Sequence, residues 1–320
     1  MKCRICSSDR TQELKTIEFY QGYPWTIYDC KECGCRFTRY DPAVYNLLHT
    51  LPGSRYGDYH QIAGECQLLF SQRDLNGIHN LLGKTSKYRF IIDEVESCKD
   101  TNRILEIGCS RGYLTSFFIL AGYDAIGADI SEEAVQGAEK AFGSHFFQAD
   151  SDAIKSRSPY DVIYHIGTIG CVEDPLGYTR RMLGMLRPGG VLLFNAPNLD
   201  ACVLEGQLWL SGAPPPDVVT LYRKGFWTQQ FHDSALIEES VEYCDSATAF
   251  TLFTQRLLRR RWGNKQPSPI AGGKPTISLA ERLFSRVDRD LRRFAALTGI
   301  ARLAPLQPAD FGLFVKMTKK

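Results

Sequence analysis

Residues 103–129, which begin Arg-Ile-Leu-Glu-Ile-Gly-Cys-Ser-Arg-Gly-Tyr and end Gly-Ala-Asp, decide the fold. A short apolar run is followed at once by a turn that contains Gly108, Ser110 and Gly112. A helical stretch with an apolar face comes next, and a second apolar run ends at Asp129. The order strand, glycine turn, helix, strand and acid predicts the first half of a nucleotide-binding βαβ unit.

The glycine turn and the acid each predict a contact with a ligand. Glycines let the backbone approach a ligand where a Cβ atom would clash, and the free N–H groups of the following helix favour a negatively charged group. Asp129 lies 21 residues after Gly108, at the spacing where an acid accepts hydrogen bonds from ribose hydroxyls. Because Ser110 and Tyr113 interrupt the dinucleotide pattern Gly-x-Gly-x-x-Gly, we expect an adenosine-like ligand rather than a dinucleotide.

The N-terminal segment carries a second chemical pattern, because five of the 11 cysteines fall within the first 35 residues. Cys3-Arg-Ile-Cys6 and Cys30-Lys-Glu-Cys33 are two Cys-x2-Cys knuckles. Each knuckle turns two thiolates toward one ion, so two knuckles complete a tetrahedral metal site. In a chain without a secretion signal such clustering favours metal over disulfides. We expect a closed, structural zinc site, in which Cys35 is an alternative to Cys33.

Length and composition limit the class of protein. A chain of 320 residues suits one large domain with appendages, and a hydrophobic content of 44% supports a sizeable core. The formal net charge of +2 neither demands nor excludes a nucleic-acid partner. The N-terminus lacks the apolar stretch of a signal peptide, and no run approaches the roughly 20 apolar residues of a transmembrane helix. We therefore expect a cytoplasmic protein.

Strand and helix patterns alternate along the middle of the chain, which predicts an α/β fold with a doubly wound, mainly parallel sheet. After Asp129 the expected strands cover residues 145–149, 160–165, 191–195, 237–243 and 311–317. The expected helices cover residues 84–98, 131–142 and 174–186, the last with Asp174 as its cap and Pro175 at its first position.

The pattern divides the chain into three parts. Residues 1–40 are expected to form the zinc ribbon. Residues 41–83 are expected to be a connector whose prolines and glycines, Gly64 among them, prevent any long helix. That connector packs the ribbon onto the main domain or serves as a lid over the cofactor. Residues 84–320 are expected to form the main domain.

Two regions of the main domain lie outside the alternating pattern. Residues 199–230 are expected to be a loop-rich substrate region, because insertions after the carboxyl end of a strand build substrate sites in such sheets. Its aromatic residues, Trp209 and Tyr222 among them, could stack on a ligand or belong to the core. Residues 251–308 are expected to be a basic helical insertion before the last strand. Its basic face is solvated, or it serves as a dimer contact, an anionic substrate site or a membrane contact.

The stretch Glu106-Ile-Gly-Cys-Ser-Arg-Gly112 resembles motif I of the class I S-adenosylmethionine (SAM) methyltransferases. Further matching pieces follow in order: Gly-Ala-Asp129, Tyr-Asp161-Val-Ile, Val-Glu-Asp-Pro175, Leu-Arg-Pro-Gly-Gly190 and Asn-Ala-Pro-Asn198. These pieces and the two cysteine knuckles together cover most of residues 1–198, and they resemble a methyltransferase family with an N-terminal zinc-binding segment. That family occurs in polysaccharide, sugar and secondary-metabolite pathways. The resemblance implies a Rossmann-like class I methyltransferase fold and SAM as the cofactor.

The resemblance also implies a set of SAM-binding residues. Gly108, Ser110 and Gly112 are expected to line the methionine part. Asp129 is expected to take the ribose hydroxyls, and Asp150 to lie near the adenine amine. The complete expected set is Glu106, Gly108, Cys109, Ser110, Gly112, Asp129, Ile130, Asp150, Ser151 and His165.

Two departures from the family pattern bear on catalysis. Many members carry Leu-Glu-His where this chain has residues 169–171, Ile-Gly-Cys, and Val218 replaces a second common histidine. A histidine-assisted mechanism is therefore in doubt, and His165 is the nearest remaining titratable group. We expect catalysis mainly by positioning of the acceptor in line with the methyl group, with Asn198 and Tyr222 as orienting groups.

Three functions remain open from the sequence. The leading one is methyl transfer from SAM to a small molecule or a sugar-like, carrier-linked biosynthetic intermediate. The second is a zinc-ribbon RNA methyltransferase, although the mixed charge of the ribbon makes nucleic acid an unexpected partner. The third is a non-catalytic SAM- or nucleotide-binding module. A homo-oligomer or a peripheral contact would use the basic insertion at residues 251–308.

Overall fold

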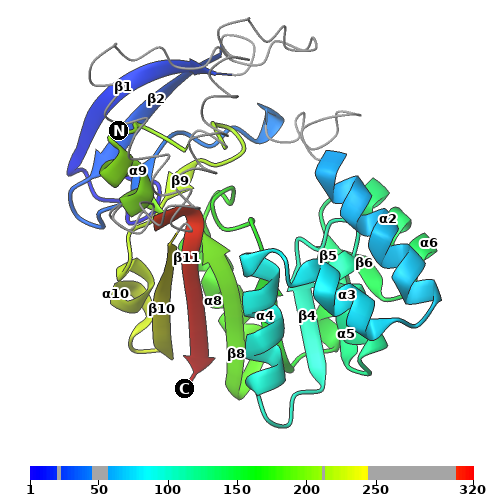
Figure 1. Cartoon of the computed structure of the whole chain (residues 1–320). Helices are drawn as coiled ribbons and strands as arrows, with labels where there is room; N and C mark the ends of the chain where they lie inside the picture. The colour runs from blue at the N-terminus through cyan, green and yellow to red at the C-terminus, as the bar shows by residue number, and fades with distance from the viewer. Residues whose placement is uncertain (20–22, 45–56, 211–212, 244–307) are drawn as a thin grey trace, which may run out of the picture. The chain divides into compact units, whose positions relative to one another are not determined.

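The computed structural model describes residues 1–19, 23–44, 57–210, 213–243 and 308–320 (Figure 1). The chain divides into two compact units. The first unit comprises Met1–Arg39, Asn198–Lys224 and Val241–Leu313. The second comprises Tyr40–Pro197, Gly225–Ser240 and Phe314–Lys320. The helical insertion predicted at residues 251–308 lies, except for Pro308, outside the described residues.

Seven described strands form the larger sheet, in the order β10-β11-β8-β7-β4-β5-β6. Parallel pairing joins β4 to β5 and β7, β5 to β6, and β7 to β8. Strand order reverses between β4 and β7, which is the switch point where open α/β sheets bind ligands. The strands are β4 (Arg103–Ile107), β5 (Asp124–Asp129), β6 (Phe146–Gln148), β7 (Tyr160–His165), β8 (Leu186–Ala196), β10 (Ala235–Tyr243) and β11 (Pro308–Lys319). The predicted mainly parallel sheet is confirmed.

Helices accompany the strands of this sheet, and their starts follow the sequence signals. The Ser131 side chain accepts a hydrogen bond from the Ala134 amide at the start of α6, and Asp174 accepts one from Gly177 at the start of α8. The helices are α2 (Gly57–Ser71), α3 (Leu75–Leu82), α4 (Ser86–Ser97), α5 (Tyr113–Leu120), α6 (Glu132–Phe142), α7 (Asp152–Ser156), α8 (Pro175–Met185) and α10 (Phe226–Phe231). No helix among the described residues has the length and apolar character needed to cross a membrane.

The expectation that residues 41–83 contain no long helix is wrong. Helix α2 runs for 15 residues through Gly64, and α3 follows it. Both helices pack against α5, and α2 also packs against α6 (Figure 1). The ring of Phe70 meets that of Phe142 edge-on, with centroids 5.2 Å apart. One glycine in a helix costs only about 1 kcal/mol, so burial of the apolar face against α5 and α6 outweighs the local signal.

Strand β8 begins earlier than predicted, at Leu186 rather than Val191. Leu186 pairs with Tyr160 of β7, and the register shifts before Val162. A Cβ atom on Gly190 would lie 3.1 Å from the carbonyl oxygen of Asp161 and 2.9 Å from that of Arg187. Helix α8 ends at Met185, just before the Pro-Gly-Gly segment, and that segment lets the irregular start of the strand approach β7.

The smaller sheet has four described strands in the order β1-β2-β3-β9, all antiparallel. They are β1 (Thr11–Phe19), β2 (Tyr23–Cys30), β3 (Arg36–Phe37) and β9 (Thr220–Leu221), and helix α9 (Leu199–Glu205) belongs to the same unit. The sequence predicted a ribbon from the N-terminal residues alone, whereas its fourth strand comes from the segment that follows β8. Trp209 and Tyr222 of that segment are buried, so they belong to the core.

Candidate functional site

The glycine turn after β4 has left-handed backbone conformations at three positions, with φ of 78° at Gly108, 49° at Ser110 and 75° at Gly112. A Cβ atom on Gly112 would lie 2.4 Å from the Phe146 ring, and one on Gly108 would lie 2.6 Å from the hydroxyl oxygen of Thr168. Gly112 therefore allows the start of α5 to pack directly on β6, and Gly108 allows the turn to approach the residues that follow β7.

Asp129 is fixed at the end of β5 by the neighbouring backbone. Its Oδ2 atom accepts a hydrogen bond from the Ser110 amide at 2.7 Å, and its Oδ1 atom accepts one from the Ser131 amide at 2.9 Å. The glycine turn is itself tied to β5, because the amides of Gly108 and Cys109 both donate to the carbonyl of Ala128. Each carboxylate oxygen keeps capacity for a further hydrogen bond, so the acid can still accept donors from a ligand.

Glu106 is buried beneath this turn. Its Oε2 atom accepts hydrogen bonds from the hydroxyl of Thr115 on α5 and from that of Tyr164 on β7, the latter at 3.1 Å. Burial raises the pKa of the Glu106 carboxyl to about 8, even though both hydroxyl donors favour its ionised form. Sequence reasoning missed Thr115 and Tyr164. The sequence feature that could have pointed to them is a hydroxyl group at a position where a buried strand or helix face usually carries an aliphatic side chain.

The other residues expected to bind the cofactor lie at the carboxyl ends of the same parallel strands. Ile130, directly after β5, is 60% exposed. Asp150 is exposed after β6, and the Ser151 side chain caps α7 by accepting from the Ala153 amide. Cys109 is buried within the glycine turn, and burial raises the pKa of its thiol well above the ordinary value. The fold thus brings the predicted set to one edge of the sheet.

His165 ends β7, and its ring packs against other aromatic rings. Its side chain is buried, its ring stacks on Phe194 with centroids 4.7 Å apart, and Tyr178 lies edge-on at 5.6 Å. Neither ring nitrogen has a hydrogen-bond partner among the described residues. Burial lowers the pKa of His165 to about 3. The ring is therefore uncharged at neutral pH and is a much weaker base than an exposed imidazole.

Asn198 and Tyr222, expected as orienting groups, belong to the first unit, whereas His165 belongs to the second. The Asn198 side chain accepts from the Asp200 amide and so caps α9, and the Leu199 amide donates to the Tyr222 carbonyl. Both side chains are fully buried. Within their unit, Asn198 and Tyr222 hold α9 beside β9.

Two matching knuckles bring four cysteines together. The Ser7 amide donates to the Cys3 carbonyl at 2.8 Å, and the Gly34 amide donates to the Cys30 carbonyl at 3.1 Å. Ser7 and Gly34 both have left-handed backbone, with φ of 60° and 72°. Each knuckle therefore closes in the same way after its second cysteine.

The sulfur positions suit one tetrahedral ion. The Sγ atoms of Cys3, Cys6, Cys30 and Cys33 all lie within 4.8 Å of one another. The separation is 3.8 Å for Cys3–Cys33 and 3.6 Å for Cys6–Cys30. Four ligands at about 2.3 Å from a zinc ion would be spaced roughly 3.8 Å apart. The buried Cys35 is not part of this group, which favours Cys33 as the fourth ligand.

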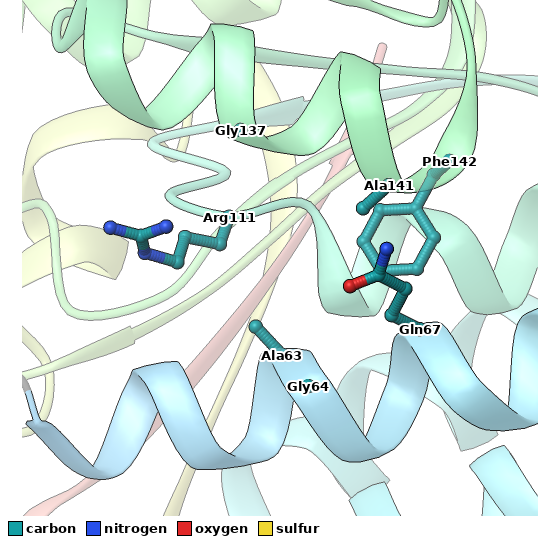
Figure 2. A pocket seen from close by; sticks show the side chains of 7 residues that line it. All are labelled: Ala63, Gly64, Gln67, Arg111, Gly137, Ala141 and Phe142. Atoms are coloured by element: carbon teal, nitrogen blue, oxygen red, sulfur yellow. The ribbon is translucent and has the colours of Figure 1, made fainter.

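A pocket of about 140 Å³ lies between α2 and α6, next to the glycine turn. It is lined by Ala63, Gly64, Gln67, Arg111, Gly137, Ala141 and Phe142 (Figure 2). The guanidinium of Arg111 points away from the Phe142 ring in this view, and it forms an ion pair with Glu133 at 3.2 Å. Sequence reasoning did not identify this pocket, because its small residues come from two helices far apart in the chain.

Comparison with known proteins agrees with the topology. Residues 81–238 match the family model for a methyltransferase domain. The chain is 30% identical over 102 residues to the ubiquinone biosynthesis O-methyltransferase of Parvibaculum lavamentivorans, a match that covers 30% of this chain and 40% of that protein. It is 33% identical over 119 residues to the malonyl-[acyl-carrier protein] O-methyltransferase of Halalkalibacterium halodurans, which covers 33% of this chain and 43% of that protein.

The chain thus spans less than half the length of these curated relatives. Among solved structures, a SAM-dependent methyltransferase from Archaeoglobus fulgidus shares 15% identity, with 73% of this chain and 92% of that chain covered and a TM-score of 0.43. The strand order and the match over residues 81–238 define a Rossmann-like methyltransferase fold. This part of the chain has the fold of a methyltransferase domain.

Proposed function

We propose that the protein transfers the methyl group of SAM to a small molecule or to a carrier-linked, sugar-like biosynthetic intermediate. The observation that carries the proposal is the Asp129 carboxylate, which two backbone amides orient at the end of β5 beside the glycine turn. The curated relatives are named O-methyltransferases of ubiquinone biosynthesis and of malonyl-acyl carrier protein. Those names support a small or carrier-linked acceptor.

The proposed cofactor placement follows the strand ends. SAM lies across the carboxyl ends of β4, β5 and β7 in this proposal. Gly108, Ser110 and Gly112 line its methionine part. Asp129 accepts hydrogen bonds from the ribose hydroxyls, and Asp150 lies near the adenine amine. The carboxyl edge of a parallel sheet at its switch point is the place where such ligands bind in this architecture.

Methyl transfer from a sulfonium mainly requires correct positioning of the acceptor, because the cationic sulfur already activates the methyl group. Holding the acceptor in line with that methyl can lower the barrier by on the order of 7 to 11 kcal/mol in favourable cases. His165 fits this mechanism better than a general-base mechanism, because its ring is buried, its nitrogens face no partner among the described residues, and its pKa is lowered to about 3.

His165→Ala is therefore expected to lower kcat by less than about 100-fold, below the loss usual for an indispensable base. Steady-state kinetics would measure this, with SAM affinity and thermal unfolding recorded alongside. His165→Phe is the matched variant, because it keeps the aromatic packing on Phe194 while it removes both ring nitrogens. A loss of 10³-fold or more in His165→Phe, with SAM affinity intact, would establish His165 as the base.

We propose further that Cys3, Cys6, Cys30 and Cys33 hold one structural zinc ion. Four thiolates fill a tetrahedral zinc ion and leave no open position for a substrate or water. The sulfur separations of 3.6 and 3.8 Å support this ligand set. In this proposal the ion supplies folding energy to the smaller sheet and takes no part in methyl transfer.

The direct test of the activity is transfer of a labelled methyl group from SAM. The acceptors would be phenols, free carboxylic acids, acids bound to acyl carrier protein and sugar nucleotides. We expect label to enter one of these classes, together with release of S-adenosylhomocysteine above the level without acceptor. Asp129→Ala is the control at the same SAM concentration. SAM binding without transfer to any class would instead favour the non-catalytic module.

A further inference from the structure

The segment Asn198–Lys224, which follows β8, is joined to the cysteine ribbon by backbone pairing. Strand β3 pairs with β9, so that Arg36 faces Leu221 and Phe37 faces Thr220. The Thr38 amide continues this edge by donating to the Val219 carbonyl at 3.0 Å. The segment therefore completes a sheet whose other three strands come from the N-terminus.

Arg36 adds a second connection, between the end of β2, next to the Cys30–Cys33 knuckle, and the middle of the segment. Its Nε and Nη2 atoms donate to the two carboxylate oxygens of Asp29, at 2.7 and 3.2 Å. Its Nη1 atom donates to the carbonyls of Leu208 and Gln207, at 3.0 and 3.3 Å. Arg36 is buried, and its charge is balanced by Asp29, the residue immediately before Cys30. The guanidinium group of Arg36 thus connects β2, through Asp29, to the segment that follows β8.

Arg4 makes a corresponding connection from the first knuckle. It stands between Cys3 and Cys6, and its Nη1 atom donates to the hydroxyl of Thr220 in β9. One arginine within the first knuckle and one that follows the second knuckle therefore contact the same segment, Arg4 at β9 and Arg36 at residues 207–208. Neither connection is local in sequence, because more than 170 residues separate the partners in each case.

We propose that Arg36 and Arg4 are positioning residues that make the order of residues 198–210 and 213–224 depend on a metal ion held by Cys3, Cys6, Cys30 and Cys33. A metal fixes the backbone of both knuckles, and the arginines carry that constraint to the segment. Segments that follow the carboxyl ends of parallel strands carry substrate-recognition residues. The consequence for acceptor binding rests on the proposed methyltransferase function, whereas the dependence on metal does not.

Hydrogen exchange of the full chain tests the dependence, with zinc bound and after chelation. Two amides report on the segment: Leu199 donates to the Tyr222 carbonyl and Gln207 to the Cys202 carbonyl. We expect chelation to speed their exchange at least tenfold, while amides of residues 103–129 change less than twofold. An equal change in both regions, or none in residues 198–224, would overturn the proposal.

Arg36→Lys distinguishes the effect of the Arg36 hydrogen bonds from the effect of metal binding, because lysine cannot bridge a carboxylate and two carbonyls. With zinc still bound, we expect Gln207 to exchange about tenfold faster and SAM affinity to stay unchanged. The matched control is Arg10→Lys in the same ribbon, whose exposed ion pair with Glu32 has side chains 71% and 54% accessible. Identical exchange in the two variants would refute the positioning role.

The kinetic prediction uses whichever acceptor the labelled-methyl experiment identifies. We expect Arg36→Lys to raise the KM for that acceptor at least fivefold, with the dissociation constant of SAM unchanged. If the role of Arg36 is purely structural, the KM for the acceptor should stay unchanged, or the dissociation constant of SAM should change together with that KM. Absence of methyl transfer would defeat the proposed function alone, because the exchange measurements need no acceptor.

Discussion

Cys6→Ser should reduce the zinc content from about one ion per chain to none and unfold the smaller sheet. The reason is energetic, because a structural zinc site in a zinc-finger peptide contributes on the order of 10 to 16 kcal/mol at neutral pH. Cys6 is only partly buried, so the serine itself costs little packing. Elemental analysis would give the zinc content, and X-ray absorption of the wild-type protein should give zinc–sulfur distances near 2.3 Å.

Cys35→Ser is the matched control for this experiment. Cys35 is fully buried in the same ribbon but lies outside the group of four cysteines, so the variant should keep its zinc. The larger sheet should remain folded in both variants, because the buried residues of the described hydrophobic cluster packed against it all lie between Cys66 and Leu193. Wild-type protein purified without chelator that carried no metal would contradict the zinc assignment, and so would a Cys6→Ser variant that kept one ion.

The contribution of Glu106 to the free energy of unfolding should fall as pH rises from about 4.5 to 8, and the lowered pKa of the buried His165 opposes this fall below about pH 6.5. Burial raises the pKa of this carboxyl from 4.5 to about 8 in the folded protein. The folded chain then holds a proton that the unfolded chain has already released, so unfolding releases a proton throughout this interval. The Glu106 contribution is therefore fully present below the unfolded pKa and is lost as pH rises through the folded pKa, at up to about 1.4 kcal/mol per pH unit.

Glu106→Gln should remove this pH dependence, because the amide does not titrate and still accepts the hydroxyls of Thr115 and Tyr164. Denaturant unfolding between pH 5 and pH 8 would measure both proteins. The matched control is Glu133→Gln, whose side chain is 83% exposed and which should keep the wild-type slope. Parallel curves for the wild type and Glu106→Gln would contradict the buried, protonated carboxyl.

The features that the sequence predicted well are those set by local chemistry. Strand β7 covers the predicted residues 160–165, and α8 starts at Pro175 with Asp174 as its cap. Both depend on signals within a few residues: an apolar run long enough for a buried strand, and a side-chain oxygen placed to accept a free helix amide. The glycine turn and Asp129 also meet as predicted, because parallel strands that flank one helix end at the same edge of the sheet.

The features that the sequence did not predict depend on contacts between distant residues. Strand β9 pairs with the N-terminal ribbon across more than 180 residues, and two residues are too few to leave a periodic pattern. Helix α2 is stabilised by its packing on α5 and α6 rather than by its own composition.

The burial of His165 could have been anticipated, because a central strand with helices on both faces buries successive side chains alike.

Calorimetric titration of SAM into the wild-type protein and into Asp129→Ala tests the central claim most directly. The wild type should bind SAM, and the variant should bind it about 1.5 to 3 kcal/mol more weakly, a loss of tenfold or more in affinity, because two hydrogen bonds to the ribose are removed. Asp152→Ala, whose carboxylate is 99% exposed, should bind SAM as the wild type does. A wild-type protein that does not bind SAM, or an Asp129→Ala variant with unchanged affinity, would contradict the account.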